Sequence, residues 1–388
     1  MVTRRTRSRT RTQLYGLATP LGVMSGTGIA GLTLGGGLGW LNGVHGLSCD
    51  NLLGAEVVTA DGDVLSVDPD SHADLLRGLR GGGGNLGVVT SFRYRLHPVQ
   101  RVLAGALMYP WSVARDVLHA HHELMATAPD ELASLVSLGL DPDGRPAVTV
   151  LLCWSGDPAV GERVLRPLRR LGAPVDSIGL VSYLDWQRAP DAAFPRGRQH
   201  YWRSGYLRHL TDTAVDTLLE VIPTIPTSES AIGLQGLRGA AARVPVDATA
   251  FPHRALQDDL LILAQWTDPA RSDEIVAWAR DAFDALRPHL ENAVYVNNLG
   301  SEGPDRVRAA YGANYDRLAA LKRTYDPTNV FRLNQNVPPI STTPSSLDLG
   351  APGGPRPATS RLAGRARSAP CRHEDGEESD RPTTSPTS

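Results

Sequence analysis

Two runs of glycine are the features of this sequence most suited to binding a ligand. One run lies between residues 26 and 39, and the other between residues 81 and 87. A glycine-rich backbone can lie close against a ligand and present its N–H groups to phosphate oxygens, because no side chains intervene. The two runs together therefore indicate one extended cofactor. Ordinary tight turns are the alternative explanation of the same glycines.

The first run also contains the pattern G-x-G-x-x-G, which is typical of dinucleotide-binding domains. It occupies residues 26–31, and Asp50 follows at the spacing of a ribose-binding acid. In those domains the pattern opens a helix, but here it continues into residues 32–39, which hold further glycines. Each glycine destabilises a helix by about 1 kcal/mol relative to alanine, so we expect no such helix and no Rossmann domain. A nicotinamide dehydrogenase is the corresponding alternative function.

The composition restricts the kinds of partner that the chain can bind. Among 388 residues the formal net charge is -2, so no overall field attracts nucleic acid or an anionic membrane, and we expect a small-molecule partner. The three cysteines form no C-x-x-C pair, which argues against a disulfide framework or a zinc site, and we expect no bound metal. Lys322 is the only lysine, and its setting fits neither a P-loop nor a Schiff base.

The two ends of the chain differ in character from the rest. Arg4 and Arg5 precede an apolar stretch at residues 14–41, as in an export signal. The glycines of this stretch disfavour a membrane helix, and it runs on into sequence typical of a folded core, so we expect a cytoplasmic protein. Export through a twin-arginine signal is the alternative. We expect residues 1–13 to form a disordered basic head and residues 341–388, rich in Pro, Ser and Thr, a disordered tail.

Between these ends the sequence predicts an α+β fold. In a first lobe, up to about residue 100, Asp61-Gly62 lies between apolar alternations and predicts a β-hairpin whose two turn residues take positive φ. From about residue 101 to 290, strands such as 148–154 and 260–266 alternate with helical stretches, which indicates an antiparallel sheet backed by helices. The turn at 141–144, Asp-Pro-Asp-Gly, supports the antiparallel arrangement.

A last structured stretch, residues 291–340, contains one predicted helix. Pro304 opens this helix and Pro327 closes it, because proline suits a first helical turn and cannot continue a helix.

Several blocks of the sequence resemble, in the same order and spacing, those of the berberine-bridge-like FAD-linked oxidases. The blocks are Gly-Leu-Ala-Thr-Pro at 16–20, the first glycine run with Trp40 and Leu41, Gly-Leu-Ser-Cys-Asp-Asn-Leu-Leu at 46–53, Arg-Gly-Gly-Gly-Gly-Asn-Leu-Gly-Val-Val-Thr at 80–90, Tyr-Val-Asn at 295–297, and Tyr-Asp-Pro-Thr-Asn-Val-Phe-Arg-Leu-Asn-Gln-Asn at 325–336. The resemblance covers residues 14–340. It implies a bipartite FAD-binding domain, residues 14–100 and 291–340, with an inserted antiparallel-sheet substrate domain, residues 101–290, that covers the isoalloxazine ring.

Carried over residue by residue, the resemblance assigns cofactor contacts to the glycine runs and to several asparagines. The residues expected to line the pyrophosphate and ribityl region are Gly26, Thr27, Gly28, Gly31, Gly35, Gly36 and Gly37. Asn51, Gly87 and Val89 are expected close by, and Asn297, Asn334 and Asn336 are expected to approach the flavin ring.

Two departures from the family pattern concern how FAD is held. Members usually carry an earlier βαβ region whose Arg-Gly-Gly-Gly-His loop often supplies a histidine bonded to the flavin, and nothing before residue 14 resembles it. In some members a cysteine at the position of Met24 forms a second bond, which a thioether cannot form. We therefore expect a truncated FAD-binding domain that holds FAD non-covalently. A catalytically inactive remnant that acts as a binding module is the alternative.

The resemblance also implies the reaction. Family members oxidise a C–OH, C–H or C–N bond of a small molecule by passing hydride to the flavin, which O₂ reoxidises; an alcohol, a sugar or a secondary metabolite is expected here. Tyr295, in a Tyr-x-Asn strand, is the candidate base, for which its pKa must fall well below the usual value of about 10. Packing within the strand is the alternative for Tyr295. We assign His253 and Trp266 to packing, with contact to the substrate as the alternative, and His121 and His122 to a solvated helix face.

Overall fold

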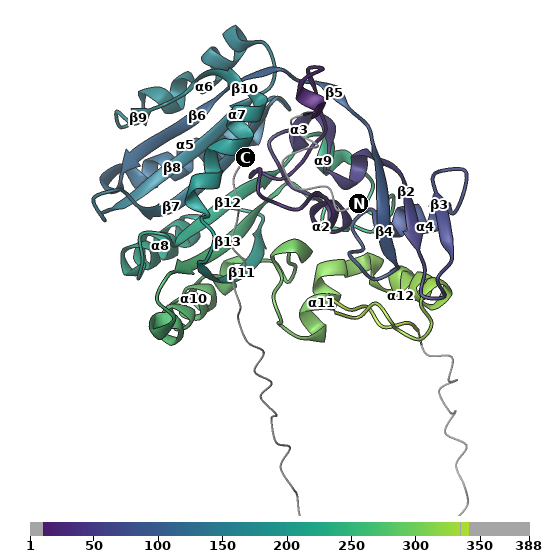
Figure 1. Ribbon diagram of the computed structural model, residues 1–388. Helices are drawn as coiled ribbons and strands as arrows, with labels where there is room; N and C mark the ends of the chain where they lie inside the picture. Colours follow the sequence, from purple (N-terminus) through teal and green to yellow (C-terminus); the bar gives the residue numbers. More distant parts are fainter. Residues whose placement is uncertain (1–10, 334, 341–388) are drawn as a thin grey trace, which may run out of the picture. The chain divides into compact units, whose positions relative to one another are not determined.

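Antiparallel sheets organise the protein in the computed structural model, which describes residues 11–333 and 335–340. The strands are β1 (Leu17–Ala18), β2 (Leu52–Val58), β3 (Val64–Val67), β4 (Val88–Tyr94), β5 (His97–Pro98), β6 (Arg101–Pro110), β7 (Leu132–Leu140), β8 (Pro146–Trp154), β9 (Val175–Asp176), β10 (Gly179–Ser182), β11 (Gln199–Leu207), β12 (Ala231–Leu237) and β13 (Gln257–Trp266). The α-helices are α2 (Ile29–Leu34), α3 (Asn42–His45), α4 (Ala73–Leu79), α5 (Ala114–Thr127), α6 (Pro158–Arg170), α7 (Tyr183–Arg188), α8 (Asp212–Val221), α9 (Ala240–Arg243), α10 (Ser272–Leu286), α11 (Pro304–Tyr311) and α12 (Tyr315–Tyr325). Figure 1 shows the two larger sheets on either side of the segment that carries α2 and α3.

The first and last parts of the chain share one hydrophobic core. The sheet β3-β2-β4 and α4 contribute Leu52 and Leu75, while the C-terminal stretch contributes Val294 and Leu318, and all four side chains are fully buried. Burial of apolar area joins these distant segments, because neither could cover its own hydrophobic face. This is the bipartite arrangement expected from the sequence.

The β2–β3 hairpin forms as predicted, but its turn differs from the prediction. Gly62 has a φ of 88°, whereas Asp61 does not have a positive φ. The N–H of Thr59 donates to the carbonyl of Asp63 at 2.9 Å, and the N–H of Gly62 donates to the carbonyl of Thr59 at 3.2 Å. The connection is therefore a longer loop in which glycine alone supplies the left-handed conformation, and a two-residue turn was the wrong prediction.

Two helix predictions are also corrected by the structure. A short helix, α2, does begin within the first glycine pattern, because Gly31 is the only glycine in it and it stops at Gly35. The predicted helix after Pro304 is broken in two, because Gly312 has a φ of 45° and a 3-10 turn at 312–314 separates α11 from α12. Among the helices of the described residues, none is long and apolar enough to cross a membrane.

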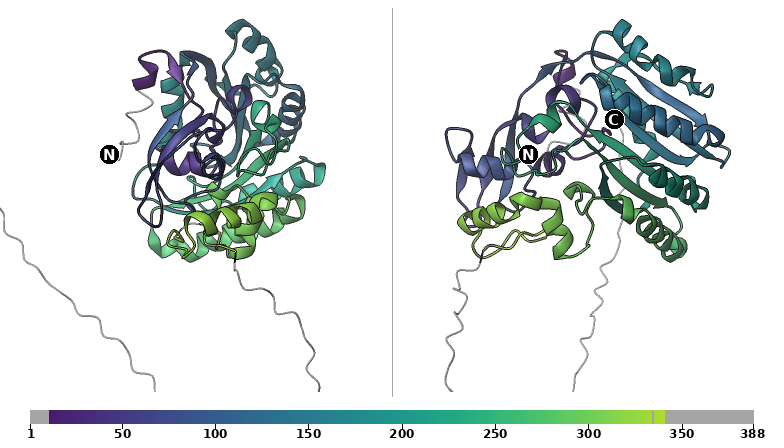
Figure 2. Two further views of the ribbon diagram at one scale, coloured as in Figure 1. Left: turned by 90° about the vertical axis from the view of Figure 1, so that its right-hand side faces the viewer. Right: turned by 180° about the vertical axis from the view of Figure 1, so that it is seen from behind.

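The largest sheet has eight antiparallel strands in the order β10-β6-β8-β7-β12-β13-β11, with β9 paired to β6. Helices α5, α6, α8 and α10 cover one face, and Leu260, Ile262 and Ala264 of β13 point into the core beneath them. Because side chains alternate along a strand, Asp259 and Gln265 of β13 point to the opposite face. Figure 1 shows α2, α3 and α9 on that side of the sheet, and Figure 2 shows the same ribbon from two further sides.

Candidate active site

The two glycine runs lie next to each other. The N–H of Gly83 donates to the carbonyl of Leu34 at 2.8 Å, which joins the second run to the first. Phe251, which precedes β13, packs against both runs: a Cβ added to Gly36 would lie 2.8 Å from its ring, and one added to Gly81 would lie 2.5 Å from its Cβ. The runs thus form one continuous surface, and a side chain from the sheet lobe packs on it.

At positions 35, 36 and 37 neighbouring protein atoms leave no room for a side chain. A Cβ on Gly35 would lie 2.0 Å from Oδ1 of Asn297, and one on Gly37 would lie 2.2 Å from Oγ of Ser48. Gly36 and Gly37 also have φ values of 123° and 96°, which side chains disfavour. Close packing therefore accounts for these three glycines, which we had expected to lie bare against a ligand.

Gly26 and Gly31 are in a different situation. A Cβ added to either would meet no atom of the described residues within 4 Å, and both glycines are exposed. Thr27 and Gly28 lie between them and are half-buried, and Gly28 forms the N-terminal boundary of α2. Residues 26–31 are therefore the part of the first glycine run whose backbone a ligand can approach.

Tyr295 is 4% exposed and its phenol oxygen lies among N–H groups. Gly37 N–H donates to it at 2.8 Å, Leu38 N–H at 3.3 Å and Asn297 Nδ2 at 2.7 Å. Burial raises the pKa of Tyr295 above its usual value, and these hydrogen bonds offset only part of that effect. The direction is opposite to the one that a base near neutral pH requires. Tyr295 also precedes a 3-10 turn at 296–298 and does not lie in the predicted strand.

Asp259 is the functional candidate that the sequence reasoning missed. It is 3% exposed, and its carboxylate accepts hydrogen bonds from Ser204 Oγ at 2.8 Å and Asn298 Nδ2 at 2.6 Å. Burial raises the pKa of Asp259 from 3.8 to about 7, although both hydrogen bonds favour the ionised form. Tyr206 lies directly opposite on β11, and its buried hydroxyl has no hydrogen-bond partner among the described residues. Two adjacent carboxyl groups, Asp258 and Asp259, at the start of the apolar run 260–264 were the signal available in the sequence.

A cleft of about 680 Å³ lies beside this group of residues, between the edge strand β11 and residues 297–302. Asn297 and Asn298 line it, so the residues that donate to Tyr295 and to Asp259 both border the same space. Trp202 also lines it, and its indole N–H is buried without a partner among the described residues. The cleft has the volume of a small-molecule site and polar groups that remain to be satisfied.

The remaining predicted cofactor residues are dispersed. Asn51 uses its side chain within the protein, donating to the carbonyls of His45 and Leu47 and pairing with His97. Gly87 and Val89 lie against β2, Gly87 with a φ of 154° beside Val57 and Val89 paired with Val57 in the sheet. Asn336 has a buried Oδ1 without a partner among the described residues, and Asn334 lies outside those residues.

Asp50 is held in a buried ion pair with Arg254. The two guanidinium nitrogens of Arg254 donate to the two carboxylate oxygens of Asp50 at 2.8 and 2.7 Å. Leu47 N–H donates to the same carboxylate at 2.8 Å. Asp50 is therefore a link between the two lobes, and the ribose contact of a nicotinamide-binding domain is not available to it.

The histidines are mostly structural. His253 hydrogen-bonds through Nε2 to the carbonyl of Ala310, and burial lowers its pKa to about 4. His121 is 5% exposed and hydrogen-bonds to Ser134, so its assignment to a solvated face was wrong. Its neighbour His122 is half-buried. The cause for His121 is that α5 presents this side to the sheet and not to solvent.

Comparisons with known proteins show the family of the chain. Residues 9–68 match the family described as "FAD binding domain", and residues 294–338 match the family described as "Berberine and berberine like". An FAD-linked oxidoreductase of Dictyostelium discoideum is 32% identical over 335 residues, which are 85% of this chain and 72% of that protein. The (R)-6-hydroxynicotine oxidase of Paenarthrobacter nicotinovorans is 31% identical over 339 residues, 84% of this chain and 73% of that protein.

Solved structures give the same result for the fold. The 6-hydroxy-D-nicotine oxidase of Arthrobacter nicotinovorans matches with a TM-score of 0.77 at 29% identity, covering 85% of this chain and 75% of that one. A berberine bridge enzyme variant in complex with (S)-reticuline matches with a TM-score of 0.74 at 22% identity, covering 84% of this chain and 72% of that one. The α+β fold, FAD as the cofactor and an oxidoreductase activity on a small molecule are thereby confirmed. The protein belongs to the berberine-bridge-enzyme-like family of FAD-linked oxidoreductases.

Proposed function

We propose that this protein is an FAD-dependent oxidase that oxidises an alcohol, sugar or secondary-metabolite substrate and passes the electrons to O₂. The observation that supports this most strongly is the position of Asp259, a buried carboxyl with a pKa of about 7 whose partner Asn298 lines the cleft. Oxidation of an alcohol or amine removes hydride from the carbon and a proton from the attached oxygen or nitrogen. A group must accept that proton, and a pKa near the working pH suits that role.

The residues present fit FAD. The backbone of Gly26 and Gly31 is open to a ligand, and Asn336 Oδ1 is a buried acceptor without a partner among the described residues. Buried polar atoms of this kind are normally satisfied, so their partner is expected from a bound molecule. FAD, when bound, supplies a two-electron acceptor. We propose that it is held non-covalently, because the family resemblance places Met24 at the position where some members carry a flavin-attaching cysteine, and a thioether cannot form that bond.

The protein's own residues have separate roles in this proposal. Asp259 takes the substrate's proton at its carboxylate, which Ser204 and Asn298 orient through the hydrogen bonds that they donate. Tyr295, our candidate base from the sequence, holds the N–H groups of Gly37 and Asn297 through its phenol oxygen. We propose Tyr295 as the residue that fixes this backbone, because N–H groups of Gly37, Leu38 and Asn297 converge on its phenol oxygen. Its raised pKa disfavours the ionised form that a base requires.

Anaerobic reduction of bound flavin by substrate tests these roles. We expect Asp259→Asn to slow reduction by about 100-fold or more, the usual contribution of a general base. Asp258→Asn is the matched control, because Asp258 is the neighbouring buried acid and pairs with Arg238. Tyr295→Phe separates the two candidate bases: a loss as large as that of Asp259→Asn would return the base role to Tyr295.

Purification tests the cofactor and the alternative function. A functional enzyme takes up FAD and acquires its visible absorption, and acid precipitation releases the flavin into the supernatant if it is not covalently bound. Flavin that remains with the precipitate would refute non-covalent binding. A protein that gains no flavin absorption on titration with FAD would support the alternative, an inactive remnant that acts as a binding module.

A further inference from the structure

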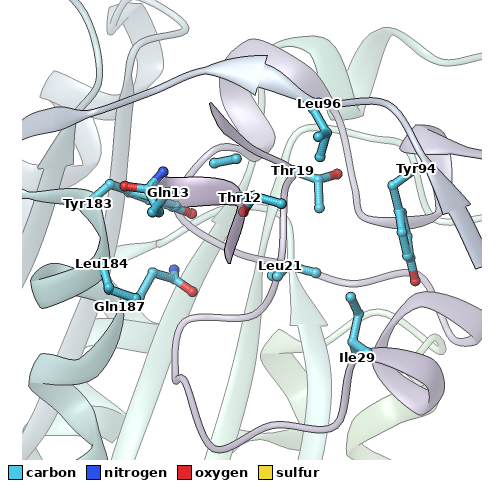
Figure 3. Close-up of a pocket in the computed structure, with 11 residues that line it drawn as sticks. Thr12, Gln13, Thr19, Leu21, Ile29, Tyr94, Leu96, Tyr183, Leu184 and Gln187 are labelled. Carbon is cyan, nitrogen blue, oxygen red and sulfur yellow. The ribbon is translucent and has the colours of Figure 1, made fainter. Parts of the chain in front are cut away.

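The loop before α2 lies against a segment of the sheet lobe. Leu21 and Ile29 border a small pocket of about 50 Å³ whose other side is formed by Tyr183 and Gln187 of α7 (Figure 3). The loop is also held from behind, because the indole N–H of Trp40 donates to the carbonyl of Val23 at 3.0 Å. The loop that leads to Gly26 is therefore enclosed by protein on two sides.

Asp191 makes a polar contact between this loop and the sheet lobe. It lies in a 3-10 turn at 189–193, directly after α7. Its Oδ1 accepts the N–H of Ser25 at 2.8 Å and the N–H of Gly26 at 3.3 Å, and its Oδ2 accepts the hydroxyl of Ser25. The carboxylate of Asp191 thus joins two segments that are 166 positions apart in the sequence. It accepts three hydrogen bonds from Ser25 and Gly26.

The turn that carries Asp191 is itself attached to β13, the strand next to the sheet edge. Gln265, which is 1% exposed, donates from Nε2 to the carbonyl of Ala193 at 3.0 Å. Gln265 and Asp259 point to the same face of β13, because they are an even number of residues apart. The strand that carries the candidate base is therefore connected, through Gln265 and Asp191, to the backbone of Gly26.

We propose that Asp191 is a positioning residue for the cofactor, one that holds Ser25 and Gly26 so that the open backbone of residues 26–31 is already ordered when FAD binds. The inference rests on the proposed function, since it takes these residues as part of the FAD site. Its physical basis is pre-organisation: a loop that is fixed beforehand loses less conformational entropy on binding than a free one. Asp191 acts through the loop and does not itself touch the cofactor.

Titration with FAD, followed by quenching of tryptophan fluorescence, tests this proposal. We expect Asp191→Ala to raise the dissociation constant for FAD at least about tenfold, because the loop then has to be ordered during binding. Asp191→Asn keeps one carbonyl oxygen for the N–H of Ser25 and is expected to recover part of the affinity. In the background of Ser25→Ala, Asp191→Ala is expected to have a smaller effect, because the two residues act through the same contact.

Asp157→Ala is the matched control. Asp157 also accepts two backbone N–H groups, from Ala159 and Val160, but it does so at the start of α6. Its loss is expected to leave the FAD dissociation constant within about twofold of wild type, even if thermal stability falls equally. If wild type binds FAD and Asp191→Ala binds it as tightly, the proposed role of Asp191 is refuted, while the proposed function stands. If wild type binds no FAD, the proposed function and this inference fail together.

Discussion

The pH dependence of flavin reduction is the most direct consequence of the environment of Asp259. With a pKa of about 7, the ionised fraction of this carboxyl falls from about 90% at pH 8 to about 1% at pH 5. If the carboxylate is the base, the rate of anaerobic flavin reduction by substrate falls in proportion, by roughly 90-fold over that interval. Stopped-flow measurement between about pH 5 and about pH 9 should give a single inflection near pH 7.

Removing a hydrogen bond to the carboxylate should move this inflection in a known direction. Ser204 donates to Oδ1 of Asp259 at 2.8 Å and favours the ionised form. Ser204→Ala is therefore expected to raise the pKa further and to shift the inflection to higher pH. An inflection that stays in place in this variant, or that persists in Asp259→Asn, would show that another group controls the profile.

The same pKa makes a prediction about stability. Folding raises the pKa of Asp259 from 3.8 to about 7, so the fold favours the protonated form. The contribution of this residue to stability is therefore greatest below about pH 4 and decreases as the pH rises to about 7, by roughly 4 kcal/mol in all. Asp259→Asn should be more stable than wild type at about pH 8 in urea unfolding. A less stable variant at that pH would contradict the burial argument.

Other parts of the structure make three further predictions. Lys322 is fully buried and donates to Asp326, Asn85 O and Phe331 O, so Lys322→Met should lose about 3–5 kcal/mol in urea unfolding, whereas exposed Arg323→Met should change little. Gly36→Ala should also destabilise the protein measurably in thermal unfolding, because Gly36 has a φ of 123° and abuts a buried ring. Burial, and secondarily the charge of His97, lowers the pKa of His45 to about 4. The stability that this residue contributes above about pH 6.5 is therefore lost as the pH falls towards 4, and His45→Gln should reduce that loss in unfolding measured against pH.

The sequence by itself determined the order and type of most elements. Apolar alternation predicted β8 and β13, and the turn at 141–144 supported the antiparallel arrangement, in which β7 pairs with β8. In this turn Asp141 N–H donates to the carbonyl of Arg145 at 2.7 Å, and Gly144 has a φ of 80°. These signals are local, since they depend on residues within one strand or turn. The blocks shared with the FAD-linked oxidases added the bipartite arrangement, which no local pattern contains.

The tertiary structure alone decided which residues form the site. Asp258 and Asp259 are equivalent in the sequence, but the pairing of β13 directs one towards Arg238 and the other towards Ser204 and Asn298. The direction of the pKa of Tyr295 likewise depends on burial by segments far away along the chain.

Contacts between distant segments explain the other misses. The sequence predicted that Gly36 faces a ligand, but in the structure it packs against Phe251. The sequence predicted no role for Asp191, which contacts Ser25 only in the folded protein. A residue's type fixes the chemistry that it can perform. Its burial and its partners, which decide whether it performs that chemistry, are set by segments that only folding brings together.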